Sequence, residues 1–239
     1  MELTTVHVGL DLGKQQDPTA LVVAEVTEES AATPAEPLLP PYTRYRVQMI
    51  ERLPLGTSYP GVATYVVKVL AALYAAWLTH AKQLLYPPSP DSLSIQLFAD
   101  ATGVGMPVVD ILREAIDADR SGAAARTILR PITFVHGEQY TRSLGVQPGR
   151  MGKAYLVSRL QALLQQQNRI DLPKGEPDIL AMVEELKTYD IHIDQDGHDT
   201  YGAFKVGTHD DLATALGLAV LEDPREYRVD YVDISSWVH

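Results

Sequence analysis

The sequence predicts an α/β protein with one mixed central sheet, in which three antiparallel strands precede parallel strand–helix–strand units and helices flank the sheet. Three observations predict this class: strand-like segments come first, helix-like and strand-like segments then alternate, and helical segments close the chain. The length of 239 residues suits one domain, and 46% of the residues are hydrophobic, which is enough for a continuous core. We therefore expect a single domain over residues 1–239.

Hydrophobic patterns predict three strands at the start of the chain. Residues 6–12 form a short apolar run, and residues 19–26 are rich in β-branched side chains. Residues 42–53 alternate polar and apolar positions, as a half-exposed strand does. A Pro- and Ala-rich segment at residues 28–41 is too long for a tight hairpin, so we expect it to be a surface loop insertion.

Helix and strand signals alternate over the middle of the chain. Apolar residues recur at helical spacing over residues 59–85, and a Pro-rich stretch ends that segment. Residues 94–99 then predict a strand, residues 107–118 a helix, and residues 127–135 a further strand. This order is typical of a parallel crossover unit.

The last part of the chain is expected to be mostly helical. Residues 137–152 form a Gly- and Arg-bearing loop or small hairpin, and residues 222–239 form a polar tail. Between them we expect helices over residues 153–166, 177–187 and from 209 or 210 to about 221, with a hairpin formed by residues 189–193 and 200–206. Taken with the three leading strands, this order matches the ribonuclease H-like arrangement.

Acidic residues fall where three of the expected elements begin or end. Asp11 ends the first strand, Asp100 ends the fourth, and Asp210 and Asp211 start the last helix. If the first and fourth strands are neighbours, Asp11 and Asp100 emerge side by side at the carboxyl edge of the sheet, where open α/β sheets bind ligands. A last helix packed over that edge would bring a third carboxylate.

Carboxylates crowded in this way predict a site for divalent cations. They repel one another unless a cation compensates their charge, and hard oxygen ligands suit Mg²⁺ or Mn²⁺. Two such ions roughly 3.5–4 Å apart activate a water and stabilise the leaving oxygen of a phosphodiester. Each acid taken alone is also explained as a turn residue or a helix cap. The coincidence of all three positions favours metal-assisted phosphodiester hydrolysis.

Four stretches of the sequence resemble, in order and spacing, the nuclease domain of the large terminase subunit of tailed bacteriophages. They are GLDLGKQQDPTALVVAE at residues 9–25, FADATGVGMPVVDIL at 98–112, KAYLVSRLQALLQQQNRIDLP at 153–173 and YGAFKVGTHDDLATALGLA at 201–219. The resemblance implies a ribonuclease H-like fold, related to Holliday junction resolvases. It also implies a domain that cuts concatemeric double-stranded viral DNA during packaging, in the cytoplasm of an infected bacterial host.

The resemblance implies roles for the acidic residues. Asp11 and Asp100 bind two divalent ions, Mg²⁺ or Mn²⁺, and Asp11 bridges both. Asp211 is favoured as the third ligand, because related resolvases place the ligand directly before a run of small residues; Asp210 is a second ligand or orients one. His209 is a candidate contact to the metal or the scissile phosphate, and a structural histidine bonded to the backbone is an equal alternative.

One feature departs from the family. A complete large terminase carries an N-terminal packaging ATPase, and this chain has no G-x-x-x-x-G-K-[ST] loop. We therefore expect an excised nuclease domain or a free-standing nuclease. Its expected partners are a packaging ATPase domain, a small terminase subunit and a portal protein.

The charge of the chain is unevenly distributed. The net charge of −11 argues against a nucleic-acid partner, but residues 120–170 carry +7 and the remainder carries −18. Arg142, Arg150 and Lys153 in that basic segment are candidate contacts to DNA phosphates, and Lys14 is a further one. A solvated surface position is the alternative for each of them.

Composition and pattern exclude some classes of protein and leave others open. The absence of cysteine removes disulfide scaffolds and cysteine nucleophiles. The N-terminus does not have the pattern of a secretory signal, and Lys68 interrupts the most apolar run, so we expect no membrane contact. The alternatives are a Holliday junction resolvase-like or transposase-like nuclease, a non-catalytic DNA-binding module, and an actin-like phosphotransferase.

Overall fold

Eight strands form one mixed sheet in the computed structural model. The structure describes residues 3–13, 17–31, 40–103, 105–143, 147–175, 177–188, 190–193, 199–202 and 210–227. The strands are β1 (Thr4–Asp11), β2 (Ala20–Glu29), β3 (Tyr42–Arg52), β4 (Leu93–Asp100), β5 (Thr127–Val135), β6 (Tyr140–Thr141), β7 (Gly149–Gly152) and β8 (Ile170–Asp171). Their order across the sheet is β6-β7-β5-β4-β1-β2-β3-β8.

The strand directions confirm the predicted fold class. The three leading strands, β1 to β3, pair antiparallel in sequence order. On the other side of β1 the strands β4, β5 and β7 follow in parallel. A helix at residues 106–117 joins β4 to β5, and a segment that contains β6 joins β5 to β7. β4 thus lies beside β1, which is the neighbour relation that the placement of the acidic residues requires.

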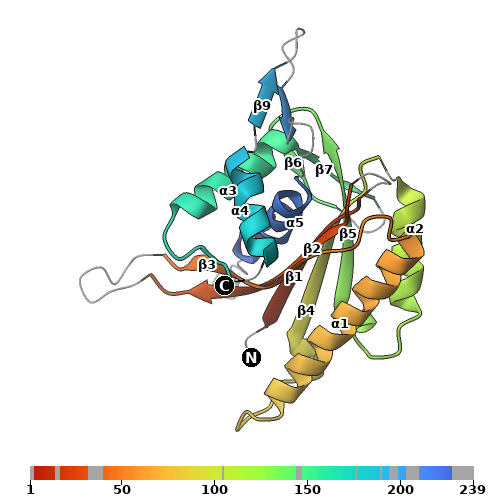
Figure 1. Cartoon of the computed structure of the whole chain (residues 1–239). Coiled ribbons are helices and arrows are strands. Elements are labelled where there is room, and N and C mark those ends of the chain that lie inside the picture. The colour runs from red at the N-terminus through yellow and green to blue at the C-terminus, as the bar shows by residue number, and fades with distance from the viewer. Residues whose placement is uncertain are drawn as a thin grey trace, which may run out of the picture.

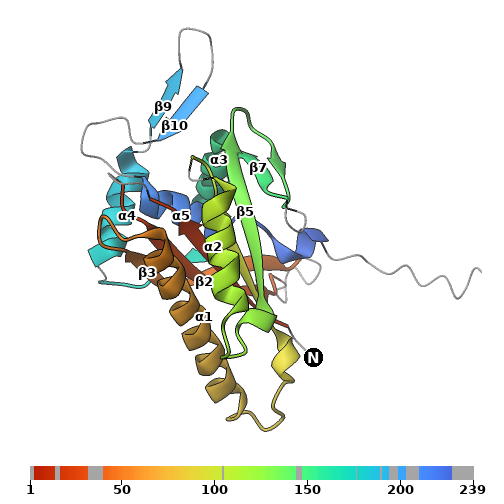
Figure 2. The ribbon, with the colours of Figure 1, turned by 90° about the vertical axis from the view of Figure 1, so that its right-hand side faces the viewer.

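Helices cover both faces of the sheet (Figure 1). The helices are α1 (Tyr59–Ala81) and α2 (Met106–Asp117) on one face, and α3 (Lys153–Gln165), α4 (Pro177–Thr188) and α5 (Asp211–Ala219) on the other. Three short 3₁₀ turns complete the described helical segments: η1 (Pro90–Ser92), η2 (Ala124–Arg126) and η3 (Pro224–Tyr227). The hairpin of β9 (Asp190–Ile193) and β10 (Asp199–Gly202) stands apart from the large sheet (Figure 2).

Alternating residues of β1 face the two helical layers. Val6, Val8 and Leu10 join the apolar cluster under α1 and α2. His7 and Gly9 face α5 instead: the His7 ring bonds to a carbonyl of α5, and a Cβ added at Gly9 would lie 2.0 Å from the backbone oxygen of Ala215. Glycine therefore allows the backbone of α5 to lie directly on β1. By the same alternation, the side chain of Asp11 lies on the α5 face.

The helix α1 contains the apolar run that Lys68 interrupts. By length and composition alone, α1 is long and apolar enough to cross a membrane. It also ends at Ala81 rather than near residue 85, because the chain turns at Lys82 ahead of the Pro-rich stretch. Val62, Val66 and Leu70 are buried in the cluster shared with the sheet, so this helix is part of the core.

The segments expected as a loop insertion and a tail are partly ordered. Within residues 28–41, Glu28 and Glu29 continue β2 and pair with β3, and residues 32–39 lie outside the described residues. Within residues 222–239, Glu222 and Asp223 are buried, and residues 228–239 lie outside the described residues. The described start of the tail is therefore packed on the domain.

Candidate functional site

Strand register brings Asp11 and Asp100 together. The parallel pairing of β1 with β4 sets Leu10 opposite Ala99, so the next residue of each strand is an aspartate at the same sheet edge. Side-chain alternation places both carboxylates on one face, since Phe98 lies in the cluster under α5 and Asp100 is two residues further along. The structure therefore places these two residues side by side, facing α5.

Burial and mutual repulsion control the protonation of this pair. Burial raises the pKa of Asp11 well above its usual range, and the charges of Asp100, Asp210 and Asp211 raise it further. Burial also raises the pKa of Asp100, while hydrogen bonds from Thr102, including one of 2.7 Å from its backbone N–H, and one with Asp11 lower it. Burial therefore opposes ionisation of both carboxyl groups.

The start of α5 brings two further carboxylates to the same place. Asp210 occupies the N-cap position, and its Oδ2 lies 3.4 Å from the Nζ of Lys153, the first residue of α3. Lys153 also stands 5.7 Å from the centre of the Phe134 ring. The ammonium group favours the ionised forms of Asp11 and Asp100 and so opposes the rise of each pKa.

Asp211 is buried and held by an arginine. Arg52, the last residue of β3, places its Nε 2.7 Å from Oδ2 of Asp211 and its Nη2 3.2 Å from Oδ1. The same Nη2 donates to Glu185 of α4, whose other oxygen accepts a hydrogen bond of 2.9 Å from the backbone N–H of Ala213. Burial raises the pKa of Glu185 to about 7; the charge of Asp211 contributes to the rise, and Arg52 opposes it.

The donor chemistry of this cluster fits a hard divalent cation. Four carboxylates from β1, β4 and α5 provide only oxygen ligands, which Mg²⁺ and Mn²⁺ prefer. Among the residues that the structure describes, no three Asp, Glu, His or Cys side chains stand in ligating geometry as they are. Asp210 and Asp211 instead pair with Lys153 and Arg52, because repelling carboxylates turn to the nearest cations.

The remaining candidates occupy different environments. Arg142 is held by the buried Glu222, with Nε 3.0 Å from Oε1 and Nη2 2.8 Å from Oε2. Arg150 is exposed on β7, close to the edge of the sheet. Lys14 and His209 lie outside the described residues. Of the three DNA-contact candidates that the structure describes, Lys153 is thus the one paired with a carboxylate of the cluster.

Sequence reasoning missed Arg52 and Glu185. Neither residue belongs to a recognisable motif, and each is one charged residue among several on its element. Arg52 does share one signal with the aspartates, because it too is the last residue of a strand. That signal alone does not identify a partner.

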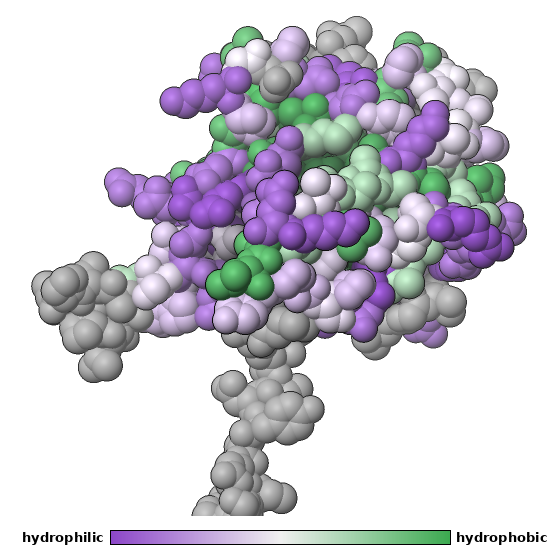
Figure 3. Space-filling model, turned by 90° about the horizontal axis from the view of Figure 1, so that it is seen from below, coloured by the Kyte–Doolittle hydropathy of each residue, from purple (hydrophilic) through white to green (hydrophobic). Residues whose placement is uncertain are grey.

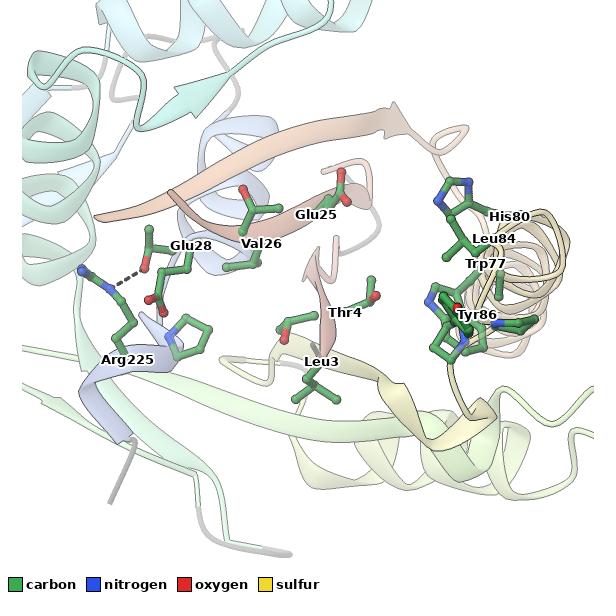
Figure 4. A pocket seen from close by; sticks show the side chains of 17 residues that line it. Leu3, Thr4, Glu25, Val26, Glu28, Trp77, His80, Leu84, Tyr86 and Arg225 are labelled. Carbon is green, nitrogen blue, oxygen red and sulfur yellow. Dashed lines mark hydrogen bonds between the residues drawn. The ribbon is translucent and has the colours of Figure 1, made fainter. Parts of the chain in front are cut away.

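A pocket of about 790 Å³ lies at the opposite end of β1 from Asp11 (Figure 4). Its walls come from the start of β1, the end of β2, the end of α1 and η3, including Leu3, Glu28, Trp77, Leu84, Tyr86 and Arg225. Figure 3 views this end of the molecule, where hydrophobic surface lies between hydrophilic side chains. The lining includes no residue of the carboxylate cluster. The pocket brings Leu3, the first residue that the structure describes, close to η3, which contains the last described residue.

Comparisons with known proteins identify the fold. No protein-family model matches the chain, and no curated protein sequence matches it significantly. The large terminase nuclease from thermophilic phage G20c with bound cobalt has a TM-score of 0.51 at 19% identity, over 92% of this chain and 81% of that chain. The same nuclease with bound magnesium has a TM-score of 0.50 at 19% identity, over 92% of this chain and 82% of that chain. The chain therefore has the ribonuclease H-like fold of a phage large terminase nuclease.

Proposed function

We propose that this chain is a metal-dependent DNA endonuclease domain of a phage large terminase, which cuts concatemeric double-stranded viral DNA during genome packaging. The observation that carries the proposal is the convergence of four carboxylates, from the ends of β1 and β4 and the start of α5. The fold supports it, because the nuclease from phage G20c has the same fold and binds cobalt or magnesium.

Asp11 and Asp100 would hold the divalent ions, with Asp11 shared between two of them. Asp210 and Asp211 would complete the sites from α5. Mg²⁺ or Mn²⁺, when bound, supplies Lewis-acid stabilisation of a phosphodiester and activation of water. The residues' own part is to fix oxygen ligands on rigid elements at the edge of the sheet, where β1 and β4 are held by their neighbours.

The raised pKa values of Asp11 and Asp100 would couple metal binding to proton release. Burial opposes ionisation of both carboxyl groups, and a bound cation would favour it. Lys153 stands beside the carboxylates and limits their repulsion. It is also a DNA-contact candidate that lies beside the cluster, so it would meet a phosphate at the cutting site.

Double-stranded DNA would approach the carboxylate edge. Arg150 is exposed for contacts to the DNA backbone, and Lys14, one residue past the described end of the β1 segment, is a further candidate. Arg142 would contribute only through the outward side of its guanidinium, because Glu222 holds the other side. We further propose that the domain works with a packaging ATPase domain, a small terminase subunit and a portal protein in the cytoplasm of the infected bacterium.

Plasmid cleavage with Mn²⁺ or Mg²⁺ tests the proposal. The wild-type chain should nick and linearise the plasmid, and chelation of the metal should abolish cutting. Asp11→Asn and Asp100→Asn should each lower the rate by at least about 100-fold. Asp117→Asn is the matched control, because this aspartate is exposed on α2, away from the cluster. Full cutting by a folded Asp11→Asn or Asp100→Asn variant would overturn the assignment.

Other outcomes would favour the alternatives. A four-way junction cut in preference to linear duplex would indicate a resolvase-like nuclease. DNA binding without any metal-dependent cutting would indicate a non-catalytic module. ATP hydrolysis without DNA cleavage would indicate a phosphotransferase.

A further inference from the structure

A buried ion-pair network lies directly behind the carboxylate cluster. Arg52 contacts Asp211 with two nitrogens, Nε at 2.7 Å and Nη2 at 3.2 Å, each directed at a different carboxylate oxygen. Such a two-pronged contact fixes the plane of the carboxylate as well as its position. Because each carboxylate oxygen has two lone pairs, Asp211 keeps acceptor capacity for another partner.

Glu185 fixes the arginine in turn. One of its oxygens accepts from Nη2 of Arg52, and the other accepts from the backbone N–H of Ala213, 2.9 Å away in the first turn of α5. The side chains of Asp211 and Glu185 are only 5% and 7% exposed. The backbone N–H of Arg52 also donates to Asp178 of α4 at 3.1 Å. The network therefore ties together the end of β3, α4 and the start of α5.

We propose that Arg52 is a positioning residue for metal binding, which holds the Asp211 carboxylate in one orientation toward Asp11 and Asp100. Glu185 acts through Arg52 by holding the guanidinium against α5. This inference rests on the proposed function, because the orientation of Asp211 matters to cleavage only if the cluster binds metal. It assigns a role to two residues that touch neither the proposed metal nor DNA.

A merely structural ion pair makes a different prediction. It would contribute to the stability of the fold, but any folded variant would bind metal as the wild type does. A positioning role requires that metal affinity falls even where the fold is retained. Metal affinity in the absence of DNA therefore separates the two roles.

The test uses the full chain and Mn²⁺ alone, titrated by calorimetry without DNA, with thermal unfolding measured in parallel. Arg52→Gln removes the charge, and Arg52→Lys keeps it but cannot form the two-pronged contact. Both should weaken Mn²⁺ binding at least about tenfold. Glu185→Gln keeps an oxygen that can accept the hydrogen bond from the backbone N–H of Ala213, so this variant should fold. It should weaken Mn²⁺ binding by about threefold, which is less than the effect of the Arg52 substitutions.

Arg44→Gln is the matched control. Arg44 also lies on β3 and also contacts a carboxylate with two nitrogens, Nε at 2.8 Å and Nη2 at 2.7 Å from Asp171, but away from the cluster. The Mn²⁺ affinity of the Arg44→Gln variant should equal that of the wild type. Wild-type affinity in folded Arg52→Lys would overturn the positioning role, whatever the fate of Arg52→Gln. Wild-type affinity in Glu185→Gln would overturn the part assigned to Glu185.

Asp11→Asn separates failure of this inference from failure of the proposed function. If the wild type neither binds Mn²⁺ nor cuts DNA, the proposed function fails. If the wild type binds and cuts, Asp11→Asn does neither, and the Arg52 variants bind like the wild type, only the positioning role fails.

Discussion

At the scale of single residues, Asp11 illustrates how a carboxylate cluster opposes folding. Asp11 is half-buried and its carboxyl group faces three other acids, so its pKa in the fold lies above the value in the unfolded chain. A group of this kind contributes stability below its unfolded pKa and loses that contribution as pH rises through its folded pKa. At neutral pH and without divalent ions, Asp11 therefore destabilises the fold.

The corresponding prediction is a gain in stability on neutralising Asp11. Asp11→Asn should raise the free energy of unfolding by about 1 kcal/mol at pH 7 in a chelator, because it removes one of the repelling charges. Urea unfolding of the two proteins measures the difference. Asp117→Asn, at an exposed position, should change stability little. A less stable Asp11→Asn protein would contradict this account of the cluster.

His7 predicts a pH dependence of the opposite sign. Its ring is buried between β1 and α5, donates from Nδ1 to the carbonyl of Ala219 at 3.0 Å, and stacks edge-on with Phe98. Burial lowers the pKa of His7 to about 4, against an ordinary value of 6.5. The neutral ring therefore stabilises the fold above pH 6.5, and this stability is lost as pH falls toward 4.

When the pH is lowered from 7.5 to 5, the titration of His7 should reduce the free energy of unfolding by about 2 kcal/mol. His7→Asn keeps a donor near the position of Nδ1 but does not titrate in this range. The variant should therefore lose less stability than the wild type over the same interval, measured by urea unfolding at both values. Equal losses in the two proteins would show that His7 is not held neutral.

At the scale of elements, the contact between β1 and α5 determines where the last two acids lie. The small residues of α5 let its backbone approach Gly9, where a Cβ would lie 2.0 Å from the Ala215 oxygen and 2.6 Å from the Ala219 nitrogen. Gly9→Ala should destabilise the protein by about 3 kcal/mol, because neither backbone atom can move without shifting the helix. Thermal unfolding measures the loss.

Gly61→Ala serves as the comparison for this prediction. Gly61 lies in the first turn of α1 and faces only the side chains of Ser58 and Thr57. Alanine there should be neutral or slightly stabilising, as it usually is in a helix. If Gly9→Ala and Gly61→Ala changed the stability equally, close packing at Gly9 would not be the cause of the destabilisation.

The elements also explain which parts of the site could be predicted. Asp11, Asp100 and the aspartates of α5 follow from strand ends and a helix start, which hydrophobic patterns locate well. Arg52 does not follow, because β3 carries an irregularity: Val23 pairs with Met49 and Ala24 with Val47, which leaves Gln48 as an extra residue. Tyr45 and Val47 of β3 face α5. If side chains alternated without interruption from these residues onward, Arg52 would face away from α5.

Contacts between distant segments could likewise not be predicted from the sequence. Glu222 was expected in a polar tail, but it is 3% exposed and accepts hydrogen bonds from Tyr140 and Arg142. Nothing local to residue 222 indicates these partners, which are some eighty positions away in the chain. Long-range burial of a charge depends on the folded arrangement and leaves no periodic pattern.

At the scale of the whole molecule, the basic segment at residues 120–170 is divided between internal and external roles. Arg142 is paired with buried Glu222, whereas Arg150 is exposed on the outer side of β7. Charge counted along the sequence therefore overstates the surface available to DNA. The two arginines should respond differently to removal.

Arg150→Gln should weaken binding to duplex DNA and reduce the slope of log affinity against log salt by about 1, with stability unchanged. Arg142→Gln should instead lower the free energy of unfolding by about 2 kcal/mol, because the buried Glu222 carboxylate loses its cationic partner and keeps only neutral donors such as the Tyr140 hydroxyl. A salt series of binding assays and urea unfolding of both variants measure these effects. A change in salt slope for Arg142→Gln alone would reverse the two assignments.

The shared location of Leu3 and η3 has a practical consequence. Both line one pocket at the start of β1, and Asp11 lies seven residue steps along the extended strand from Thr4, roughly 23 Å away. A protein fused ahead of Leu3, or a surface to which the chain is immobilised there, would sit behind the sheet edge that carries the carboxylates. The molecule can therefore be tethered by this end on a bead or sensor chip with the carboxylate edge facing the solution.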